Sequence, residues 1–204
     1  MRRKVGSICM ILGMIMVCGA VFLLVHNERQ ALQAARTSAS VLPMVQAQIA
    51  PEPTPEKLQQ LLVPVELLEP EELEMTEVVI DGNAYIGYLS IPALEVELPV
   101  LSEWSYELLE IAPCRYFGTL REDNLVLMAH NYHRHFGEIS TISIGEPLSF
   151  TDMDGIITEY EIVARDILVP GAVEEMTAGD YDLTLFTCTY GGQSRVAVYC
   201  EKTP

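Results

Sequence analysis

Hydrophobic and polar positions divide the chain into three parts. Val5–Val25 holds 21 residues without a charge, and about 20 apolar residues are enough to span a bilayer as a helix. Residues 26–77 are polar and rich in proline and glutamate. From residue 78 onward, short apolar runs alternate with turn residues, which is typical of β-strands. We therefore predict a membrane helix at 5–25, a linker at 26–77 and a β-rich domain at 78–204.

The orientation in the membrane follows from the charges beside the helix. The N-terminal residues MRRK carry three bases and no acid, and positive charge marks the cytoplasmic side. This predicts a single-pass plasma-membrane protein with residues 1–4 in the cytoplasm and the β-rich domain outside the cell. A cleaved signal peptide is the alternative, although the apolar stretch is long for one and no clear A-x-A cleavage site follows it.

Residues 26–77 are predicted to be a solvated extracellular linker. Repeated prolines break helices and favour extended chain, and a run of glutamates without a base precedes the β-rich domain. The first part of the segment is compatible with a helix that continues out of the membrane. A second interpretation concerns Lys57–Leu68, where four apolar residues fall at helical spacing. The stretch 57–77 would then be a lid over the active site or a partner-binding element.

Residues 78–204 are predicted to hold about seven or eight short strands with brief helices between them. The predicted β-runs are Tyr85–Pro92, Val96–Leu101, Asn124–His130, a pair within Pro147–Val169 and a pair within Asp182–Cys200. The predicted short helices are Trp104–Ile111 and His135–Ile142. Many short strands of this kind favour a mostly β fold, a closed or nearly closed β-barrel.

Charge and cysteine content exclude several classes of function. The formal net charge is −17, and because residues 1–4 contribute +3, the rest of the chain carries −20. Such an acidic body is a poor partner for nucleic acid or for an anionic membrane surface. Two of the five cysteines lie in the apolar segment, which leaves Cys114, Cys188 and Cys200. Three cysteines do not make a disulfide-rich scaffold, but a Cys114–Cys200 bridge stays open.

The stretch Asp182–Cys200 carries the strongest chemical signal. Cys188 ends an apolar run, Gly191 and Gly192 form a turn, and Arg195 begins the next β-prone run. A hairpin therefore places a thiol and a guanidinium on the same edge of a sheet. A thiol beside a fixed positive charge is stabilised as the nucleophilic thiolate.

His130, at the end of another β-run, is the best acid–base partner for this thiol. If His130 and Cys188 adjoin in the fold, they support acyl transfer through a thioester, and Arg195 would stabilise the oxyanion. The residues alone leave open a buried structural thiol at Cys188 and an ordinary strand-edge charge at Arg195. His133 and His135 invite a metal site, but their spacing is not H-E-x-x-H and no nearby carboxylate or cysteine completes a set. We predict neither a metal nor another cofactor.

These motifs resemble those of the sortases of Gram-positive bacteria. The sequence TLFTC at Thr184–Cys188 matches the family's T-L-x-T-C motif at every fixed position, and Arg195 follows on the next β-run as the family's arginine does. NLVLMAH followed by Asn131 resembles the strand that delivers the family's histidine, with Ala129 where many sortases have glycine. YIGYLSIP and ELPVL resemble the opening strands, so the resemblance covers about Ala84–Glu201.

The resemblance implies an eight-stranded sortase-type β-barrel and a cysteine transpeptidase. Cys188 would be the nucleophile, His130 the general acid and base, and Arg195 the group that stabilises the substrate carbonyl or oxyanion. Supporting or substrate-binding roles would fall to their neighbours in the motifs, namely Thr187, Ala129 and Asn131.

The resemblance also implies the partners. Substrates would be secreted proteins with a C-terminal sorting signal, typically L-P-x-T-G, and the acyl group would pass to an amine of a cell-wall precursor or to a pilin lysine. The chain ends at EKTP without a sorting signal, so we expect the enzyme and not a substrate. It lacks a C-terminal membrane segment and has a short connection at Pro170–Tyr181, which argue against the pilin-polymerising class. A non-catalytic peptide-binding domain and a cysteine hydrolase are the alternatives.

Overall fold

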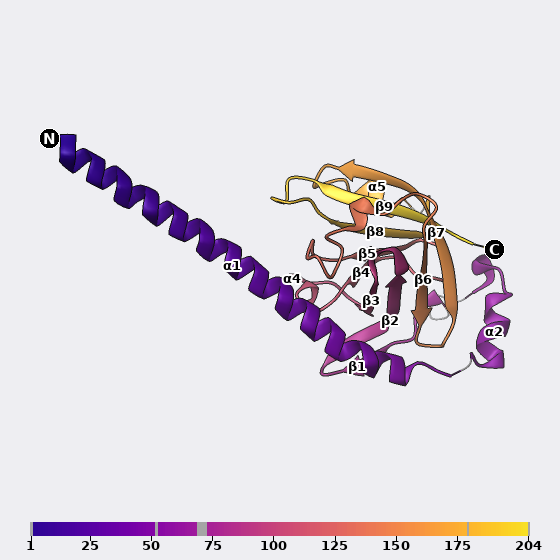
Figure 1. Cartoon of the computed structure of the whole chain (residues 1–204). Helices are drawn as coiled ribbons and strands as arrows, with labels where there is room; N and C mark the ends of the chain where they lie inside the picture. The colour runs from indigo at the N-terminus through magenta and orange to yellow at the C-terminus, as the bar shows by residue number, and fades with distance from the viewer. Residues whose placement is uncertain (1, 52, 69–72, 179, 204) are drawn as a thin grey trace.

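The computed structural model describes residues 2–51, 53–68, 73–178 and 180–203. A long helix runs beside a closed β-structure (Figure 1). The helices are α1 (Arg2–Gln48), α2 (Pro55–Leu61), α4 (Tyr106–Leu109) and α5 (Val173–Thr177), with the 3-10 turns η1 (Val65–Leu67), η2 (Pro92–Leu94) and η3 (Ile139–Thr141). The strands are β1 (Val78–Ile80), β2 (Asn83–Ile91), β3 (Val96–Leu101), β4 (Cys114–Phe117), β5 (Leu125–Met128), β6 (Pro147–Asp152), β7 (Ile157–Leu168), β8 (Leu183–Cys188) and β9 (Arg195–Lys202).

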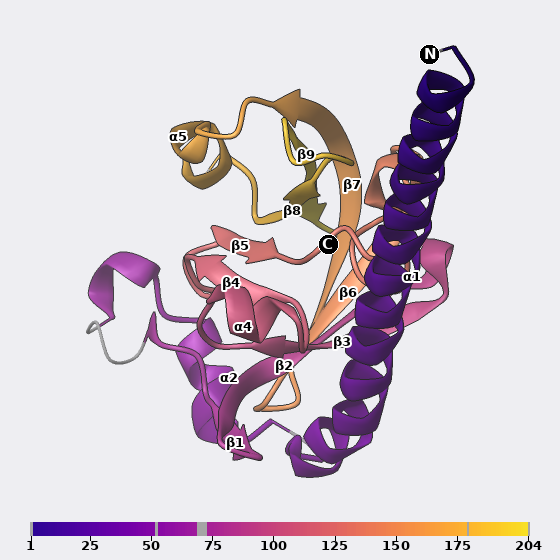
Figure 2. The same ribbon diagram turned by 90° about the vertical axis from the view of Figure 1, so that its left-hand side faces the viewer.

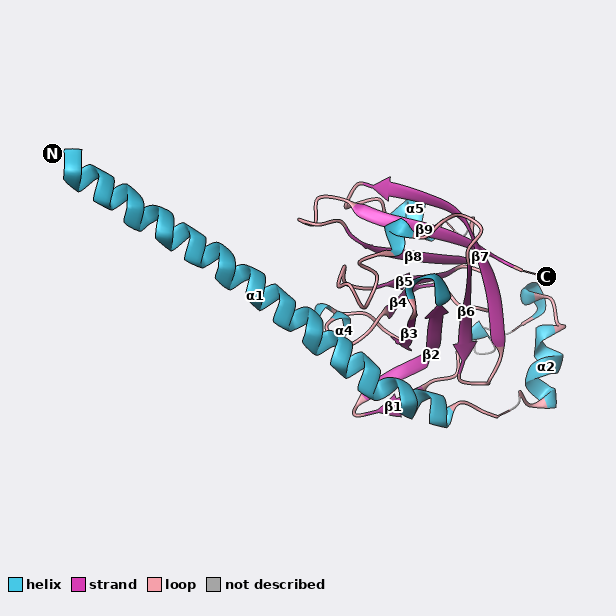
Figure 3. Cartoon of the chain, viewed as in Figure 1, coloured by secondary structure: helices cyan, strands magenta, loops and turns pink. Residues whose placement is uncertain are grey.

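Eight strands close into a barrel. Their order is β2-β3-β4-β5-β8-β9-β7-β6, and the circuit closes because β2 pairs with β3 and also with β6. β1 is a ninth, short strand that pairs with β2. β5 runs parallel to β8 and β3 runs parallel to β4, whereas the other neighbours are antiparallel. This topology confirms the predicted mostly β, eight-stranded barrel, with short helices around it (Figure 3).

Side chains alternate between the interior and the outer face of the barrel. Along β8, Leu183 and Leu185 belong to the interior cluster, whereas Phe186 belongs to a separate cluster. Successive side chains of a strand point to opposite faces, so Thr187 points inward and Cys188 points outward. The thiol of Cys188 therefore lies on the outside of the barrel rather than in its core.

The strands predicted between Tyr85 and Cys200 all form, and the helix predicted near Trp104 is α4. The sequence did not reveal β4, because its four residues, CRYF, are too few to show a period of two. The helix predicted at His135–Ile142 is reduced to turns and to the single turn η3. Between β7 and β8 the described residues form only the five-residue helix α5, in line with the short connection in the sequence.

Helix α1 extends far beyond the predicted membrane segment. It is 47 residues long, and its C-terminal part packs along the barrel (Figure 2). Ala34, Ser38, Val41 and Val45 are buried at spacings of four and three residues, which places them on one face of the helix. The two valines join a hydrophobic cluster with side chains of β2, β3 and α4. This differs from the solvated linker that we expected at 26–77, because small residues give only a weak hydrophobic signal.

Cys114 and Cys200 do not form the bridge that the sequence left open. Both are free thiols, and they are buried in two different clusters. Burial raises the pKa of the Cys114 thiol to about 12, and burial also raises the pKa of Cys200, because an apolar environment disfavours the thiolate. Of the three cysteines in the barrel domain, Cys188 alone is partly exposed.

Candidate active site

Strand register brings the three predicted catalytic side chains together. In the parallel pair β5–β8, Met128 lies opposite Phe186, and continuing this register by two residues brings His130 level with Cys188. In the antiparallel pair β8–β9, Cys188 lies directly opposite Arg195. Residues opposite each other point to the same face of a sheet. His130, Cys188 and Arg195 therefore form a row across three neighbouring strand ends.

This row opens into a largely apolar pocket with a volume of about 190 Å³. Cys188, His130 and Arg195 all line the pocket and are half-buried. The rest of its wall comes from α4, β4, β5, β8 and the connection with α5, through side chains that include Trp104, Tyr106, Tyr116, Met128, Met176 and Phe186. Apolar walls around a few polar groups are typical of sites that hold an extended peptide or another small ligand.

Two hydrogen bonds tie His130 to the strand that carries Cys188. Thr187 Oγ1 donates to the carbonyl oxygen of Ala129 at 2.8 Å, and Ala129 N donates to the carbonyl oxygen of Phe186 at 3.3 Å. Thr187 and Ala129 are 2% and 3% exposed, so water does not compete for these bonds. They fix the residue before His130 against the residue before Cys188.

The guanidinium of Arg195 is held at the mouth of the pocket. Its Nη1 donates to the carbonyl oxygens of Gly192 at 3.2 Å and Ser194 at 3.1 Å. Both acceptors belong to the loop between β8 and β9. The positive charge is therefore anchored by the same hairpin that carries Cys188, as the sequence predicted.

His130 is biased towards its neutral form. Burial lowers the pKa of His130, while the carboxylate of Glu110 acts in the opposite direction. The ring of Tyr132 lies 4.8 Å from the His130 ring, measured between centroids. A neutral imidazole can accept a proton from an attacking group and return it to a leaving group. Asn131 is half-buried beside His130, but it is not among the residues that line the pocket.

His133 and His135 have different surroundings. His133 Nδ1 lies 2.8 Å from Glu138 Oε1 on the surface. His135 is 0% exposed, and burial lowers its pKa to about 4, with a smaller effect from His130. Within residues 2–51, 53–68, 73–178 and 180–203, no three His, Cys, Asp or Glu side chains converge as a metal site would require.

Sequence reasoning missed several residues of this site. Trp104 lines the pocket from the connection before α4, and Tyr116 and Met176 line it from β4 and α5. Glu110 acts on the charge of His130. These positions carry no motif, and only folding brings them near Cys188. The aromatic side chain of Trp104, at the start of the predicted helix Trp104–Ile111, was the one available signal.

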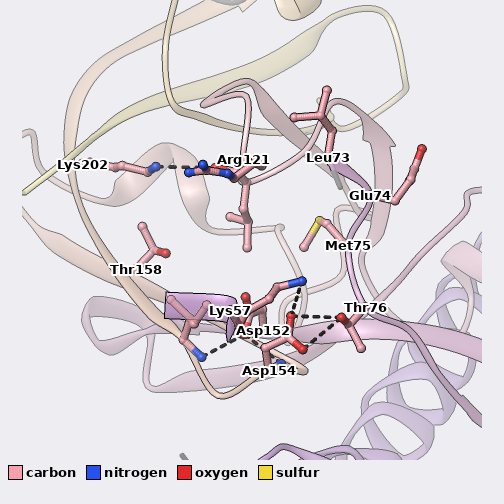
Figure 4. A pocket seen from close by; sticks show the side chains of 12 residues that line it. Lys57, Leu73, Glu74, Met75, Thr76, Arg121, Asp152, Asp154, Thr158 and Lys202 are labelled. Atoms are coloured by element: carbon pink, nitrogen blue, oxygen red, sulfur yellow. Dashed lines mark hydrogen bonds and ion pairs between the residues drawn. The ribbon is translucent and has the colours of Figure 1, made fainter. Parts of the chain in front are cut away.

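The segment expected to form a lid lies at the far end of β7 from Cys188. Lys57 Nζ contacts Asp154 Oδ2 at 2.9 Å, and Thr76 Oγ1 donates to the same oxygen at 2.9 Å (Figure 4). Asp154 belongs to the β6–β7 turn. From there β7 runs for 12 residues, about 35 Å, before Leu168 pairs with the strand end next to Cys188.

The lid interpretation of residues 57–77 is therefore wrong for the part that the structure describes. None of the described residues in this range lines the pocket around Cys188; several line the second pocket, shown in Figure 4. The helix predicted at Lys57–Leu68 also ends early, since α2 stops at Leu61. The acidic residues within 69–72 lie outside the described residues.

A model of the sortase domain matches residues 89–203, more than half of the chain. No curated protein matches the chain significantly.

The solved structures described below, which are similar to this chain, are sortases. Sortase C1 from Streptococcus suis is 26% identical, with a TM-score of 0.52 over 59% of this chain and 73% of that chain. Sortase C from Streptococcus pneumoniae is 19% identical, with a TM-score of 0.60 over 81% of this chain and 97% of that chain. A sortase D5 transpeptidase from Clostridium perfringens is 19% identical, with a TM-score of 0.55 over 73% of this chain and 94% of that chain. Most of these structures are of sortase C.

Proposed function

The chain belongs to the sortase family of cysteine transpeptidases, and on that premise we propose that Cys188, His130 and Arg195 form its active site. The row of these three side chains in one pocket carries the proposal. Cys188 is the nucleophile, His130 the general acid and base, and Arg195 the stabiliser of the oxyanion. Thr187 and Ala129 position His130 through the hydrogen bonds described above.

The proposed reaction proceeds in two transfers of an acyl group. His130 takes the proton of the Cys188 thiol. The resulting thiolate attacks the carbonyl carbon of the scissile peptide bond, and the Arg195 guanidinium stabilises the negative oxygen that forms. Protonated His130 gives its proton to the nitrogen of the leaving peptide as the carbon–nitrogen bond breaks, which leaves a thioester on Cys188. An acceptor amine then attacks the thioester, His130 accepts its proton, and the thiolate leaves as the new amide forms.

The proposed donor is a secreted protein with a sorting signal near its C-terminus, and the proposed acceptor is an amine of a cell-wall precursor. The half-open apolar pocket suits the extended chain of such a signal. We place the enzyme on the outer face of the plasma membrane, anchored by the apolar part of α1. A helix suited by length and composition to cross a membrane, Met10–Gln48, supports an anchor, although a signal sequence meets the same criterion.

An uncleaved anchor is the form we propose, because the apolar stretch continues directly into the half of α1 that packs on the barrel. We propose that the enzyme does not belong to the pilin-polymerising class of sortases, because the connection between β7 and β8 that holds α5 is short. The number of sortase C structures among the similar folds is the observation against it.

A peptide-library cleavage assay tests the function. The protein should begin near residue 26, so that the buried face of α1 is kept. We expect cleavage by the unaltered protein and none by Cys188→Ala, with mass spectrometry showing an acyl-enzyme and, in the presence of an amine, the amide product. Water-derived products alone, across many amines, would indicate a cysteine hydrolase. Absence of cleavage, together with a Cys188 thiol whose reactivity is unchanged by His130→Ala, would indicate a non-catalytic binding domain.

A further inference from the structure

Helix α1 determines which end of the barrel faces the membrane. Beyond its C-terminal end, Ala50 N donates to the carbonyl oxygen of Met153 in the β6–β7 turn at 3.2 Å. This turn lies at the far end of β7 from Cys188. The helix therefore runs along the barrel from the side of Cys188, and the apolar stretch ending at Val25 lies beyond that side (Figure 1).

Helix α1 sets the distance between the membrane and the barrel, and this distance is short. Ala34, the first described α1 residue that is buried against the barrel, lies nine positions after Val25, and nine helical steps span about 14 Å. The lipid headgroups take up roughly 5–7 Å of this distance on each side of the bilayer. Because Val41 and Val45 are also packed, the barrel does not swing as it would on a flexible linker.

The loop between β8 and β9, Thr189–Ser194, projects into the space between the barrel and the membrane. It extends beyond the rest of the barrel towards the N-terminal half of α1 (Figure 1). The loop has no charged residue, and Tyr190 in it is 93% exposed. At the neighbouring end of β7, Ile167 and Val169 are 72% and 68% exposed. Exposed tyrosine and aliphatic side chains without charge favour the membrane–water interface.

We propose that the β8–β9 loop rests on the bilayer surface, with Tyr190 in the headgroup layer, so that the active site opens at the membrane. This inference rests on the uncleaved anchor of the proposed function. The surface it fits is a lipid layer of little net charge. The chain after residue 4 carries −20, and the loop offers no lysine or arginine to an anionic headgroup.

Contact with lipid bears directly on the catalytic machinery. The guanidinium of Arg195 is bonded to the carbonyl oxygens of Gly192 and Ser194 in this loop. A loop supported by the bilayer holds these acceptors, and with them the guanidinium, in one place. Donor peptides and acceptor amines that are themselves attached to the membrane then reach the pocket more readily than soluble ones.

A fluorescence experiment tests the contact, because Trp104 is the only tryptophan in the chain. In the full-length chain with Trp104→Phe, Tyr190→Trp reports on the loop. Val79→Trp is the matched control, since Val79 is 68% exposed on β1, which packs beside the C-terminal part of α1. Each protein is placed in phosphatidylcholine nanodiscs, with and without brominated acyl chains near the headgroups.

We expect the brominated lipid to quench the Tyr190→Trp protein several-fold more strongly than the Val79→Trp protein, with a blue shift for the former on insertion into nanodiscs. Equal quenching of the two proteins, or quenching of neither, would overturn the proposal. The readout does not need activity, so Cys188→Ala can be present throughout. A failed sortase assay would therefore leave this test intact, and a failed contact would leave the reaction intact.

The second test increases the distance between the barrel and the membrane. Inserting seven helix-forming residues after Arg29 lifts the barrel by about 10 Å. We expect this insertion to remove the quenching of the Tyr190→Trp protein. In the enzyme without the tryptophan substitutions, the insertion should slow the cleavage of a lipid-tethered sorting peptide several-fold, while cleavage of the soluble peptide is unchanged. Quenching that persists after the insertion contradicts contact at the proposed height.

Discussion

At the scale of single residues, the site depends on a few hydrogen bonds and one opposing charge. Thr187 joins the backbone of β8 to the residue before His130, and Glu110 raises the pKa of His130 against the effect of burial. His135 is fully buried, and neither of its ring nitrogens has a hydrogen-bond partner within the described residues. Each of these three residues can be tested without touching Cys188.

Thr187→Val keeps the shape of the side chain but removes the donor to Ala129. The carbonyl left without a partner should lower the free energy of unfolding by about 1–2 kcal/mol. The displaced His130 should lower kcat by roughly tenfold to a hundredfold with little change in KM. Steady-state kinetics and urea unfolding measure both effects, and Thr187→Ser, which keeps the hydroxyl, is the control. Equal behaviour of the two variants would show that this hydrogen bond does not position His130.

Glu110→Gln should shift the pH dependence of catalysis in a defined direction. The variant removes a negative charge that raises the pKa of His130, so this pKa falls further. The limb of the kcat/KM profile that reports His130 should then move to lower pH. Glu107→Gln, on the exposed face of α4, is the matched control and should leave the limb in place. A limb that stays fixed or moves to higher pH in Glu110→Gln contradicts the assignment of that limb to His130.

His135→Leu should make the fold less sensitive to acid. Burial lowers the pKa of His135 to about 4, whereas an unfolded histidine has a pKa of about 6.5. Between these values the unfolded chain binds a proton that the folded chain does not, so stability is lost as pH falls from about 6.5 to about 4. Removing the imidazole should abolish a loss on the order of 3 kcal/mol.

Urea unfolding of residues 26–204 at several pH values checks this prediction. At pH 7 the leucine variant should match or exceed the stability of the parent, because it removes two buried nitrogens that have no hydrogen-bond partner in the described part of the chain. His133→Leu is the surface control, since His133 is exposed. Parallel stability curves for the parent and His135→Leu would show that His135 is not the group responsible.

At the scale of elements, the site is a product of strand pairing, and α1 is part of the domain. β8 lies between β5 and β9, so one parallel and one antiparallel pairing align the three proposed catalytic side chains. Outside the barrel, one face of α1 covers a hydrophobic cluster of β2, β3 and α4. The catalytic domain therefore begins, in physical terms, before the boundary predicted at residue 78.

Val45→Ala should measure the contribution of α1 to the barrel. Val45 is 0% exposed within the cluster that α1 shares with the barrel, and removing two buried methyl groups should cost about 2 kcal/mol. Met44→Ala is the neighbouring control, because Met44 is 43% exposed. Urea unfolding of residues 26–204, followed by Trp104 fluorescence, gives both values. If Val45→Ala costs no more than Met44→Ala, α1 does not stabilise the domain.

At the scale of the whole molecule, the dominant features are a strongly acidic body and a helix that holds this body close to the membrane. The charge of −20 after residue 4 lowers the electrostatic potential around the pocket and attracts cations. An acceptor amine is an ammonium ion in water at neutral pH. The body therefore favours the approach of the second substrate that the proposed reaction needs.

Ionic strength should separate the two half-reactions. Raising salt from about 0.02 M to about 0.5 M shortens the Debye length to a few ångströms. The kcat/KM for a cationic acceptor amine should fall by a factor on the order of 10, whereas cleavage of an uncharged sorting peptide should change little. A neutral acceptor of similar size, such as a hydroxylamine, is the control. Equal salt dependence for both acceptors would show that the acidic body does not guide the amine.

The sequence by itself determined the local elements, the barrel class and the candidate reactive residues of the hairpin. Strand periodicity, the glycine turn and the TLFTC motif all involve residues close together in the chain, and their physical causes act over the same short range. The sequence was enough to predict that Cys188 and Arg195 lie on neighbouring strands, because a hairpin with a short loop allows little other geometry. His130 was identified by type and position, as a histidine at the end of an apolar run.

Only the tertiary structure decided what lies around these residues. Ala129 and Thr187 are 58 positions apart, and their contact exists because the whole barrel closes. The same closure brings Trp104 and Tyr116 to the pocket. It also buries Cys114 and Cys200 in different clusters, and it places the segment expected to be a lid far from Cys188. The buried face of α1 also escaped prediction, since Ala34, Ser38 and two valines look solvated until a complementary surface is present. Local sequence reports interactions along the chain, whereas packing depends on partners that only the complete fold supplies.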